Sequence, residues 1–253
     1  MVSGAAGAAS GGSVTGGSSA AVPRLAILGD GRMGRAIDAL ARERGFEVEA
    51  LLGRDALVGD PARVRAALDR CDVAIEVTAP AAAVDHAFLC LDAGCPVVVG
   101  TTGWYDRLPE VEGRVAETGG ALLWAANFSL GVTLMKALCM RAGALIGRTK
   151  GFEAALVETH HAGKRDAPSG TALVLARETA AGLGAEVPIT SVRLGHAPGT
   201  HELVLDGAFE QLVVRHVARD RLVFADGALH AAVWLPGRVG LWTMDDVFEM
   251  EGA

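Results

Sequence analysis

Stretches rich in lysine or arginine are missing from this sequence, which has 23 basic and 30 acidic residues and a formal net charge of −7. Nucleic-acid-binding proteins need such stretches, because clustered positive charge neutralises the phosphate backbone. The composition therefore argues against a nucleic-acid partner. If the ligand of this chain is an anion, individual basic residues at the binding site must attract it.

Cysteine is also scarce, and its spacing matches no redox or metal-binding pattern. The four cysteines, Cys71, Cys90, Cys95 and Cys139, lie in apolar surroundings without a Cys-x-x-Cys or Cys/His arrangement. This pattern is typical of reduced thiols in the core of a cytoplasmic protein. The longest apolar runs, such as residues 121–126, are far shorter than the roughly 20 residues of a membrane span. We therefore predict no transmembrane segment.

Charge is absent from the first 22 residues, which are almost entirely glycine, alanine and serine. A secretory signal peptide needs a basic start and a strongly apolar middle, and this segment has neither. It also contains too little apolar surface to order itself by burial. We expect residues 1–22 to form a disordered leader outside the fold.

The pattern from Pro23 onward is that of strands alternating with helices. The apolar run 25–28 ends in a glycine-rich turn at 29–34, after which apolar residues recur at helical spacing up to Gly45. Further strands are expected at 48–52, 73–77, 97–99 and 121–124. Such alternation implies a parallel sheet with right-handed connections. Residues 23–127 are therefore predicted to form a Rossmann-type α/β domain, completed by about 232–253.

The turn at 29–34 has the spacing Gly-x-Gly-x-x-Gly where a dinucleotide-binding site requires it. Glycines let the backbone approach a pyrophosphate, and the following helix points its N–H groups at the negative charge. Near the expected adenosine ribose, Asp55 could accept a bond from the 2′-hydroxyl of NAD, whereas Arg54 could pair with the 2′-phosphate of NADP. The sequence thus leaves NADH or NADPH open. The cofactor-binding residues predicted here are Gly29, Asp30, Gly31, Arg32, Met33, Gly34 and Arg54.

Polar or glycine-rich turns follow three more of the predicted strands. In an open parallel sheet the ligand crevice lies outside the carboxyl ends of the strands, so these turns are expected to line it. The alternative is that they are ordinary strand-to-helix connections with capping residues. The turns contain Thr78, Ala79 and Pro80, then Gly100, Thr101 and Thr102, and then Ala125, Ala126, Asn127 and Phe128.

The second half of the chain has a different pattern. A long apolar helix is expected from 132 to about 146, followed by a strand at 152–157 and a helix from about 169 to 181. Strands at 189–194, 203–205 and 211–217 then follow at short spacing, and a helix at 222–233 is expected to return the chain to the first domain. We predict a second α+β domain with an open mixed sheet at 128–231.

Residues 158–172 contain the densest group of chemically active side chains. His160 and His161 are adjacent, Lys164 lies nearby, and Ser169-Gly170-Thr171 supplies hydroxyls and helix N-terminal N–H groups. Such a group can hold an anion and transfer a proton. Alternatively, the histidines are surface residues and Ser169 or Asp166 caps a helix. No metal site is predicted, because adjacent residues on a strand point to opposite faces.

The chain resembles the 4-hydroxy-tetrahydrodipicolinate reductase (dihydrodipicolinate reductase) family of lysine and diaminopimelate biosynthesis. The resemblance runs from about Leu25 to the C-terminus. Its most specific element is Glu-x-His-His-x-x-Lys-x-Asp-x-Pro-Ser-Gly-Thr-Ala, which is complete at 158–172. Gly-Arg-Met-Gly at 31–34, Gly-Thr-Thr-Gly at 100–103 and Asn-Phe-Ser at 127–129 follow the family order.

This resemblance implies an enzyme that uses NADH or NADPH to reduce a cyclic dicarboxylate. It assigns His160 as the acid that protonates the substrate, and Lys164 as the catalytic lysine that assists it. It implies substrate binding by His161, Ser169, Gly170 and Thr171. It further implies cofactor contacts at 29–33, 100–102 and 125–128, a cytoplasmic homotetramer, and a second domain that serves both substrate binding and oligomerisation.

Some features depart from the family. The glycine turn is one residue shorter than in many members, His230 stands where many have arginine, and Glu202 replaces a small residue. Two other functions compete with the reductase. Another two-domain Rossmann enzyme, of the aspartate or homoserine dehydrogenase type, would share the glycine turn but not the motif at 158–172. A non-catalytic dinucleotide sensor would be expected to lack His160 or Lys164, and both are present.

Overall fold

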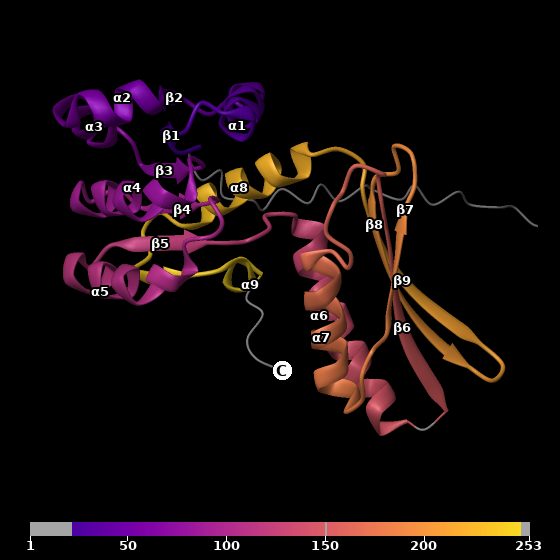
Figure 1. The fold of residues 1–253 in the computed structure, drawn as a ribbon. Helices are drawn as coiled ribbons and strands as arrows, with labels where there is room; N and C mark the ends of the chain where they lie inside the picture. The colour runs from indigo at the N-terminus through magenta and orange to yellow at the C-terminus, as the bar shows by residue number, and fades with distance from the viewer. Residues whose placement is uncertain (1–21, 150, 249–253) are drawn as a thin grey trace, which may run out of the picture.

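The structure, a computed structural model, describes residues 22–149 and 151–248. These residues build two sheets, each with its own helices, lying side by side (Figure 1). The predicted leader at 1–22 lies outside the described residues apart from Val22, which is exposed.

The first sheet has six strands in the order β10-β5-β4-β3-β1-β2. All of its neighbouring pairs are parallel. The order reverses beside β1, because β2 lies on one side of it and β3 on the other, and ligands of open α/β sheets bind at such a point. The strands are β1 (Leu25–Leu28), β2 (Val48–Leu52), β3 (Val73–Glu76), β4 (Val97–Val99), β5 (Ala121–Trp124) and β10 (Gly240–Trp242).

Helices cover both faces of this sheet, which explains why strands such as β1 and β4 are continuous apolar runs. On β1, Leu25 and Ile27 face one helical layer while Ala26 and Leu28 face the other, and all four are fully buried. One layer contains α1 (Arg32–Glu43) and α8 (Leu222–Trp234). The other contains α2 (Arg54–Gly59), α3 (Pro61–Leu68), α4 (Pro80–Asp92) and α5 (Leu108–Thr118), the last preceded by the 3-10 helix η1 (Tyr105–Arg107).

Helix α8 returns the chain from the second sheet to the first. Ala225, Ala228 and Leu229 of this helix are buried in the same core as β1 and α1. Gly227 allows close contact with the loop after β5, because a Cβ there would lie 1.7 Å from the carbonyl oxygen of Phe128. The chain then forms β10 and the short helix α9 (Met244–Val247).

The second sheet has four strands in the order β7-β6-β8-β9. The β6 and β7 pair is parallel, whereas β6 with β8 and β8 with β9 are antiparallel, so the sheet is mixed. Its strands are β6 (Phe152–His160), β7 (Ile189–Arg193), β8 (Gly199–Gly207) and β9 (Gln211–Ala218).

Two helices, α6 (Leu130–Arg148) and α7 (Gly170–Leu183), cover one face of the second sheet. They approach closely where small residues meet, since a Cβ on Gly143 would lie 2.2 Å from the carbonyl oxygen of Thr179. By length and composition alone α6 could also cross a membrane, although the sequence predicts no transmembrane segment. One such helix is weak evidence for a membrane protein, since core helices pass the same test, and Met135 and Cys139 of α6 are buried against the second sheet.

The predicted fold class is confirmed: a Rossmann-type parallel sheet is joined to a second sheet of mixed strands. Strands β1, β2, β4 and β5 have the predicted bounds. The predictions for the polar strands were too short, since β6 continues to His160 and β8 spans Gly199–Gly207 rather than 203–205. Strand β10 was not predicted.

Candidate active site

The inner face of the second sheet changes from apolar to polar as it approaches the first domain. Side chains alternate along a strand, so Leu156, Glu158 and His160 of β6 share the face that α6 and α7 cover. Strand register places Glu158 beside His201 of β8, and His201 beside His216 of β9. Three neighbouring strands thus contribute polar side chains at one level of the sheet.

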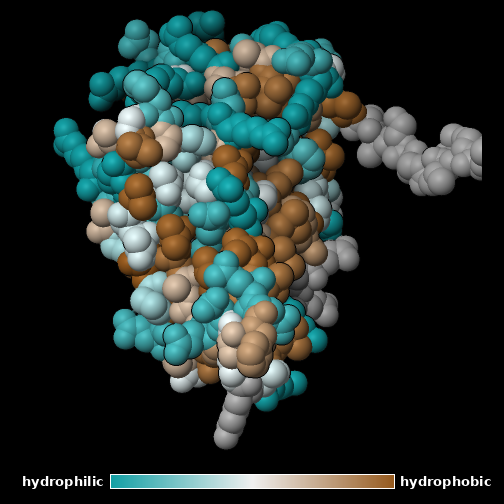
Figure 2. Space-filling model, turned by 90° about the vertical axis from the view of Figure 1, so that its right-hand side faces the viewer, coloured by the Kyte–Doolittle hydropathy of each residue, from teal (hydrophilic) through white to brown (hydrophobic). Residues whose placement is uncertain are grey.

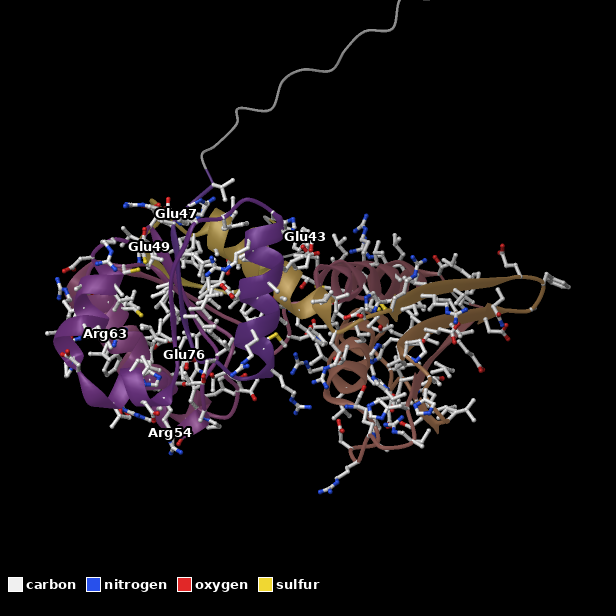
Figure 3. All side chains as sticks on the ribbon, turned by 90° about the horizontal axis from the view of Figure 1, so that it is seen from above. Glu43, Glu47, Glu49, Arg54, Arg63 and Glu76 are labelled. Carbon is white, nitrogen blue, oxygen red and sulfur yellow. The ribbon has the colours of Figure 1, made fainter. Side chains whose placement is uncertain are left out.

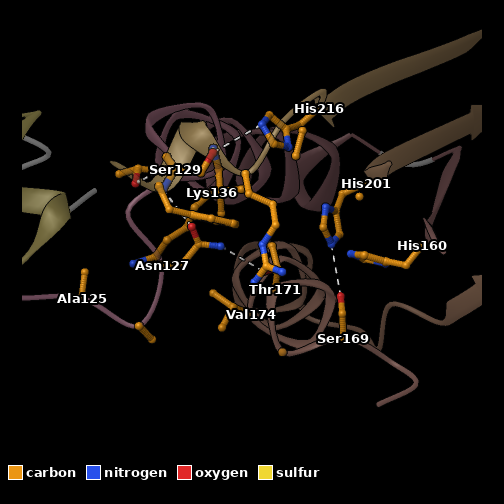
Figure 4. Close-up of a pocket in the computed structure, with 18 of the residues that line it drawn as sticks. Ala125, Asn127, Ser129, Lys136, His160, Ser169, Thr171, Val174, His201 and His216 are labelled. Carbon is orange, nitrogen blue, oxygen red and sulfur yellow. Dashed lines mark hydrogen bonds between the residues drawn. The ribbon is translucent and has the colours of Figure 1, made fainter. Parts of the chain in front are cut away.

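Ser169 connects this polar group to helix α7. It is the N-cap of α7, and its hydroxyl oxygen accepts a hydrogen bond from Ala172 N at 3.2 Å. The same hydroxyl lies 3.1 Å from His201 Nε2 (Figure 4). Ser169 therefore caps helix α7, which was one of the two roles predicted for it, and it also contacts His201. The N–H groups of Gly170 and Thr171 lie in the first turn, where a helix offers no internal acceptor.

Glu158 is the most completely buried charged group here, with no exposed surface. One carboxylate oxygen is hydrogen-bonded to His160 Nδ1. The other accepts a bond of 2.7 Å from Arg193 Nη2 and one of 3.3 Å from Ser169 N. A buried charge is costly unless it is paired and hydrogen-bonded, and Glu158 is both.

Burial and these partners shift the pKa values of the group. Burial raises the pKa of Glu158, but hydrogen bonds led by that from Arg193 outweigh it and bring the pKa to about 2. Burial lowers the pKa of His160, while Glu158 acts in the opposite direction. For His201, burial followed by repulsion from His160 lowers the pKa to about 4. Glu158 is therefore ionised and His201 neutral near neutral pH.

A cleft of about 970 Å³ opens between the two sheets, beside this group. The structure brings nine of the predicted site residues together around it: His160, His161, Lys164, Ser169, Gly170 and Thr171 from the second domain, with Ala125, Ala126 and Asn127 from the loop after β5. Both halves of the chain thus line one cavity.

Basic side chains make the second-domain side of the cleft suitable for an anion. Lys164 lines it and forms an ion pair with Asp166 at 2.9 Å. Lys136 of α6 also lines it and pairs with Asp245. Arg177 contributes a guanidinium from α7. These charges supply the local attraction that an acidic chain needs to bind an anionic ligand.

The loop after β5 is hydrogen-bonded to both helices of the second domain. Asn127 Nδ2 donates to Thr171 Oγ1 at 3.3 Å, and Asn127 Oδ1 accepts from Ser129 N at 2.8 Å. Ser129 is the N-cap of α6, and its hydroxyl lies 3.5 Å from His216 Nε2 (Figure 4). Asn127 therefore connects the end of the first sheet to the start of α7.

The glycine turn fits a dinucleotide by its local geometry. Gly29 has φ of +112°, and Gly34 packs so closely that a Cβ on it would lie 1.7 Å from the Gly29 carbonyl oxygen. At Gly31 a Cβ would meet no atom within 4 Å, so the protein itself does not require glycine there. A pyrophosphate approaching the N-terminus of α1 would use that open space.

The remaining predicted cofactor residues lie outside the cleft lining. Arg54 is the first residue of α2, and Figure 3 shows it at the edge of the first domain. Thr101 is nearly buried, and its carbonyl oxygen accepts a bond from Trp104 Nε1 at 2.8 Å. Gly100 lies close to Val77 and Phe128, since a Cβ there would be 3.0 Å from a side-chain carbon of Val77 and 3.3 Å from one of Phe128.

Two of the three departures from the family, Glu202 and His230, do not line the cleft. Glu202 alternates with His201 on β8, and its carboxylate lies 3.3 Å from Arg215 Nε of β9. His230 is half-exposed on α8, and its Nδ1 lies 3.3 Å from a carboxylate oxygen of Asp226. Both side chains have partners of their own.

Glu158, His160 and His201 also place metal-ligand atoms within 4.8 Å of one another. The Glu158 carboxylate, however, is already engaged by Arg193 and His160. A cation would have to displace the Arg193 guanidinium from a buried ion pair. The geometry therefore favours a hydrogen-bonded network over a metal site.

Sequence reasoning assigned no role to four residues of this network: Glu158, Arg193, His201 and His216. They lie on four different strands, and only strand register brings them together. Glu158 began the motif that drew attention to the segment, but its partner Arg193 is 35 residues away.

The fold and the site together are those of a dinucleotide-dependent oxidoreductase, with a cleft lined by basic side chains between its two sheets. Residues 23–128 match the family described as dihydrodipicolinate reductase, N-terminus, and residues 131–248 match dihydrodipicolinate reductase, C-terminus. The chain belongs to the dihydrodipicolinate reductase family.

Individual relatives are similar over nearly the whole chain. The 4-hydroxy-tetrahydrodipicolinate reductase of Acinetobacter baumannii is 34% identical, covering 86% of this chain and 93% of the relative. That of Christiangramia forsetii is 31% identical, covering 88% and 96%. Among solved structures, the dipicolinate-bound dihydrodipicolinate reductase from Paenisporosarcina sp. TG-14 superposes with a TM-score of 0.75 at 22% identity, covering 88% of this chain and 98% of that one. This last likeness supports the fold.

Proposed function

We propose that this chain reduces 4-hydroxy-tetrahydrodipicolinate (dihydrodipicolinate) to tetrahydrodipicolinate, a step of lysine and diaminopimelate biosynthesis, in the cleft between its domains. The observation that carries the proposal is the convergence of Asn127 with His160, Lys164 and Thr171 around one cavity. The family membership names the reaction, and this convergence provides a place for it. A dinucleotide sensor would need neither the proton-transfer group nor the anion site.

The substrate carboxylates have two separate sites in this proposal. Lys164 offers an ammonium group beside His160 and His161. The first turn of α7 offers the N–H groups of Gly170 and Thr171 together with the positive end of the helix dipole. Two anion sites of different geometry suit a dicarboxylate.

His160 is the proton donor. When bound, the nicotinamide supplies the hydride, and the neighbouring carbon must then take up one proton. Glu158 accepts from His160 Nδ1, which leaves Nε2 for the substrate. Burial lowers the pKa of His160 in the free protein, but a bound dianion favours the imidazolium. A positioned acid of this kind contributes about 10² to 10⁴ in rate.

The cofactor is NADH or NADPH, held by the first domain. The glycine turn 29–34 would hold the pyrophosphate at the start of α1, and Gly100, Thr101 and Thr102 with residues 125–128 would flank the nicotinamide. Arg54 and Asp55 stand together at the start of α2, where either could read the adenosine ribose. In the division proposed here, residues 23–127 and about 232–253 bind the cofactor, and 128–231 bind substrate.

Assembly and location complete the proposal. We place the enzyme in the cytoplasm as a homotetramer formed through the second sheet. The face of that sheet opposite α6 and α7 carries exposed apolar residues, including Val213, which is 42% exposed, and Val192. Figure 2 looks onto this side of the molecule and shows apolar side chains gathered there.

The direct test is turnover. Substrate generated enzymatically from pyruvate and aspartate semialdehyde should cause the protein to oxidise NADH or NADPH. This oxidation is measured as the loss of the reduced-nicotinamide absorbance. Omitting aspartate semialdehyde is the control. Failure with both cofactors, while the protein remains folded, would contradict the proposed function.

A further inference from the structure

A buried ion pair lies directly behind the proposed proton donor. Glu158 has no exposed surface, and Arg193, which pairs with it from β7, is 18% exposed in its side chain. Buried ion pairs contribute little net stability, because desolvation offsets their attraction, and apolar pairs often replace them without loss. A fully buried carboxylate beside the cleft therefore calls for a function.

The second oxygen of Glu158 indicates that function. Arg193 and the Ser169 N–H occupy one oxygen, and the other is directed at His160 Nδ1. A carboxylate that remains ionised can only accept, so the proton of the neutral imidazole stands on Nδ1. The His160 ring is thus oriented with its Nε2 atom pointing away from Glu158.

Space for that orientation comes from β8. A Cβ on Gly199 would lie 3.1 Å from His160 Nε2, closer than most side chains tolerate, and Gly199 lines the cleft with His160. His201 stands edge-on to the His160 ring, with centroids 5.2 Å apart. The imidazole is held on one side by Glu158 and bordered on another by His201.

We propose that Glu158, held in place by Arg193, is a positioning residue for this reaction: it fixes the Nδ1–H tautomer of His160 and stabilises the imidazolium that donates its Nε2 proton. This inference rests on the proposed function. The step balances, because the substrate carbon gains the Nε2 proton and His160 becomes neutral until solvent reprotonates it. Glu158 keeps its charge throughout.

The charged groups that face His160 determine whether a substitution raises or lowers its pKa. Glu158 from β6 favours the imidazolium, whereas Lys164 from the following loop and Arg193 from β7 disfavour it. His201 of β8 and, behind it, His216 of β9 add no charge when each carries a single ring proton, and burial lowers the pKa of both towards that neutral form. Removing Glu158 therefore lowers the pKa of His160, and removing the Arg193 charge raises it.

The test measures both rate and titration in the full chain. Glu158→Gln keeps the size of the side chain and removes its charge. We expect kcat to fall by roughly 10² to 10⁴, because a positioned acid contributes about that much and the loss of a carboxylate that orients a catalytic histidine costs up to about 10⁴, with a much smaller change in substrate KM. The alkaline loss of kcat should move to lower pH. NMR titration of the His160 ring should show a lower pKa and a changed ratio of tautomers.

Two further variants separate positioning from folding. Arg193→Gln should move the alkaline limb of the kcat profile in the opposite direction, towards higher pH. Glu158→Asp restores the charge with a shorter reach, so it should recover part of the pKa but less of the rate. Glu153→Gln, on the exposed end of the same strand, is the matched control and should behave like the unmodified protein.

Failure of this inference can be recognised separately from failure of the proposed function. If the unmodified protein turns over and Glu158→Gln retains its kcat and the His160 titration, the positioning role is wrong. Parallel shifts in Glu158→Gln and Arg193→Gln would also contradict it. If the unmodified protein does not turn over, the proposed function fails, while the NMR titration still tests whether Glu158 controls His160.

Discussion

The buried histidine at 201 should make the protein sensitive to mild acid. His201 is only 4% exposed, and burial lowers its pKa from 6.5 to about 4. In the unfolded chain the same imidazole takes up a proton at its ordinary pKa. Above the unfolded pKa of 6.5, His201 is neutral in both states and does not oppose folding. As pH falls from 6.5 towards 4, the unfolded chain takes up a proton that the folded protein does not, so the free energy of unfolding falls.

The size of the effect follows from the two pKa values. Linkage between them gives a loss of about 2 kcal/mol of unfolding free energy from His201 alone between about pH 7 and about pH 5. For a chain of this size, such a loss corresponds to a fall in Tm of roughly 4–8 °C. The ionised Glu158 adds little in this range, because its titration lies at lower pH.

The assay compares unfolding of the unmodified protein with that of His201→Gln across this range. The variant should be less stable near neutral pH, because the buried contact with Ser169 is altered, yet its stability should fall less with acid, by about 2 kcal/mol. His196→Gln, at an exposed histidine after β7, is the control. Equal pH dependence of the unmodified protein and His201→Gln would refute the reasoning.

Three other substitutions test separate parts of the account. Lys164→Ala should raise substrate KM and lower kcat, about tenfold or more in kcat/KM, because a charged hydrogen bond contributes about 1.5–3 kcal/mol; unchanged steady-state kinetics would exclude its role. Arg54→Ala should weaken NADPH more than NADH in a fluorescence titration, and equal weakening would show that Arg54 does not read the 2′-phosphate. Gly34→Ala should destabilise the first domain and abolish dinucleotide binding, because its Cβ would collide with the Gly29 carbonyl oxygen; a stable variant that binds cofactor would contradict this packing.

The apolar strands of the first sheet were predictable because both of their faces are buried. Runs such as Leu25–Leu28 and Val97–Val99 are entirely apolar, and turn residues bound them. Strand β8 was harder to delimit, because Thr200, His201 and Glu202 at its start are polar. Strand β10 has only three residues, and its pairing with β5 depends on a segment about 120 positions earlier in the chain.

In the candidate site, too, some residues were predictable from the sequence and others were not. His160, Lys164 and Thr171 were found because one continuous motif contains them, and they do line one cleft. Arg193 and His201 could not be assigned, because their proximity to Glu158 arises from strand register. Local sequence thus predicted the residues that are proposed to touch substrate, whereas the residues that support them could be found only from the fold.

The central claim is that His160 donates the proton in the cleft between the domains. Steady-state kinetics of His160→Gln, with saturating NADH or NADPH and enzymatically generated substrate, test it most directly. The account predicts a loss of about 10² to 10⁴ in kcat with little change in cofactor KM. A kcat equal to that of the unmodified protein would contradict it.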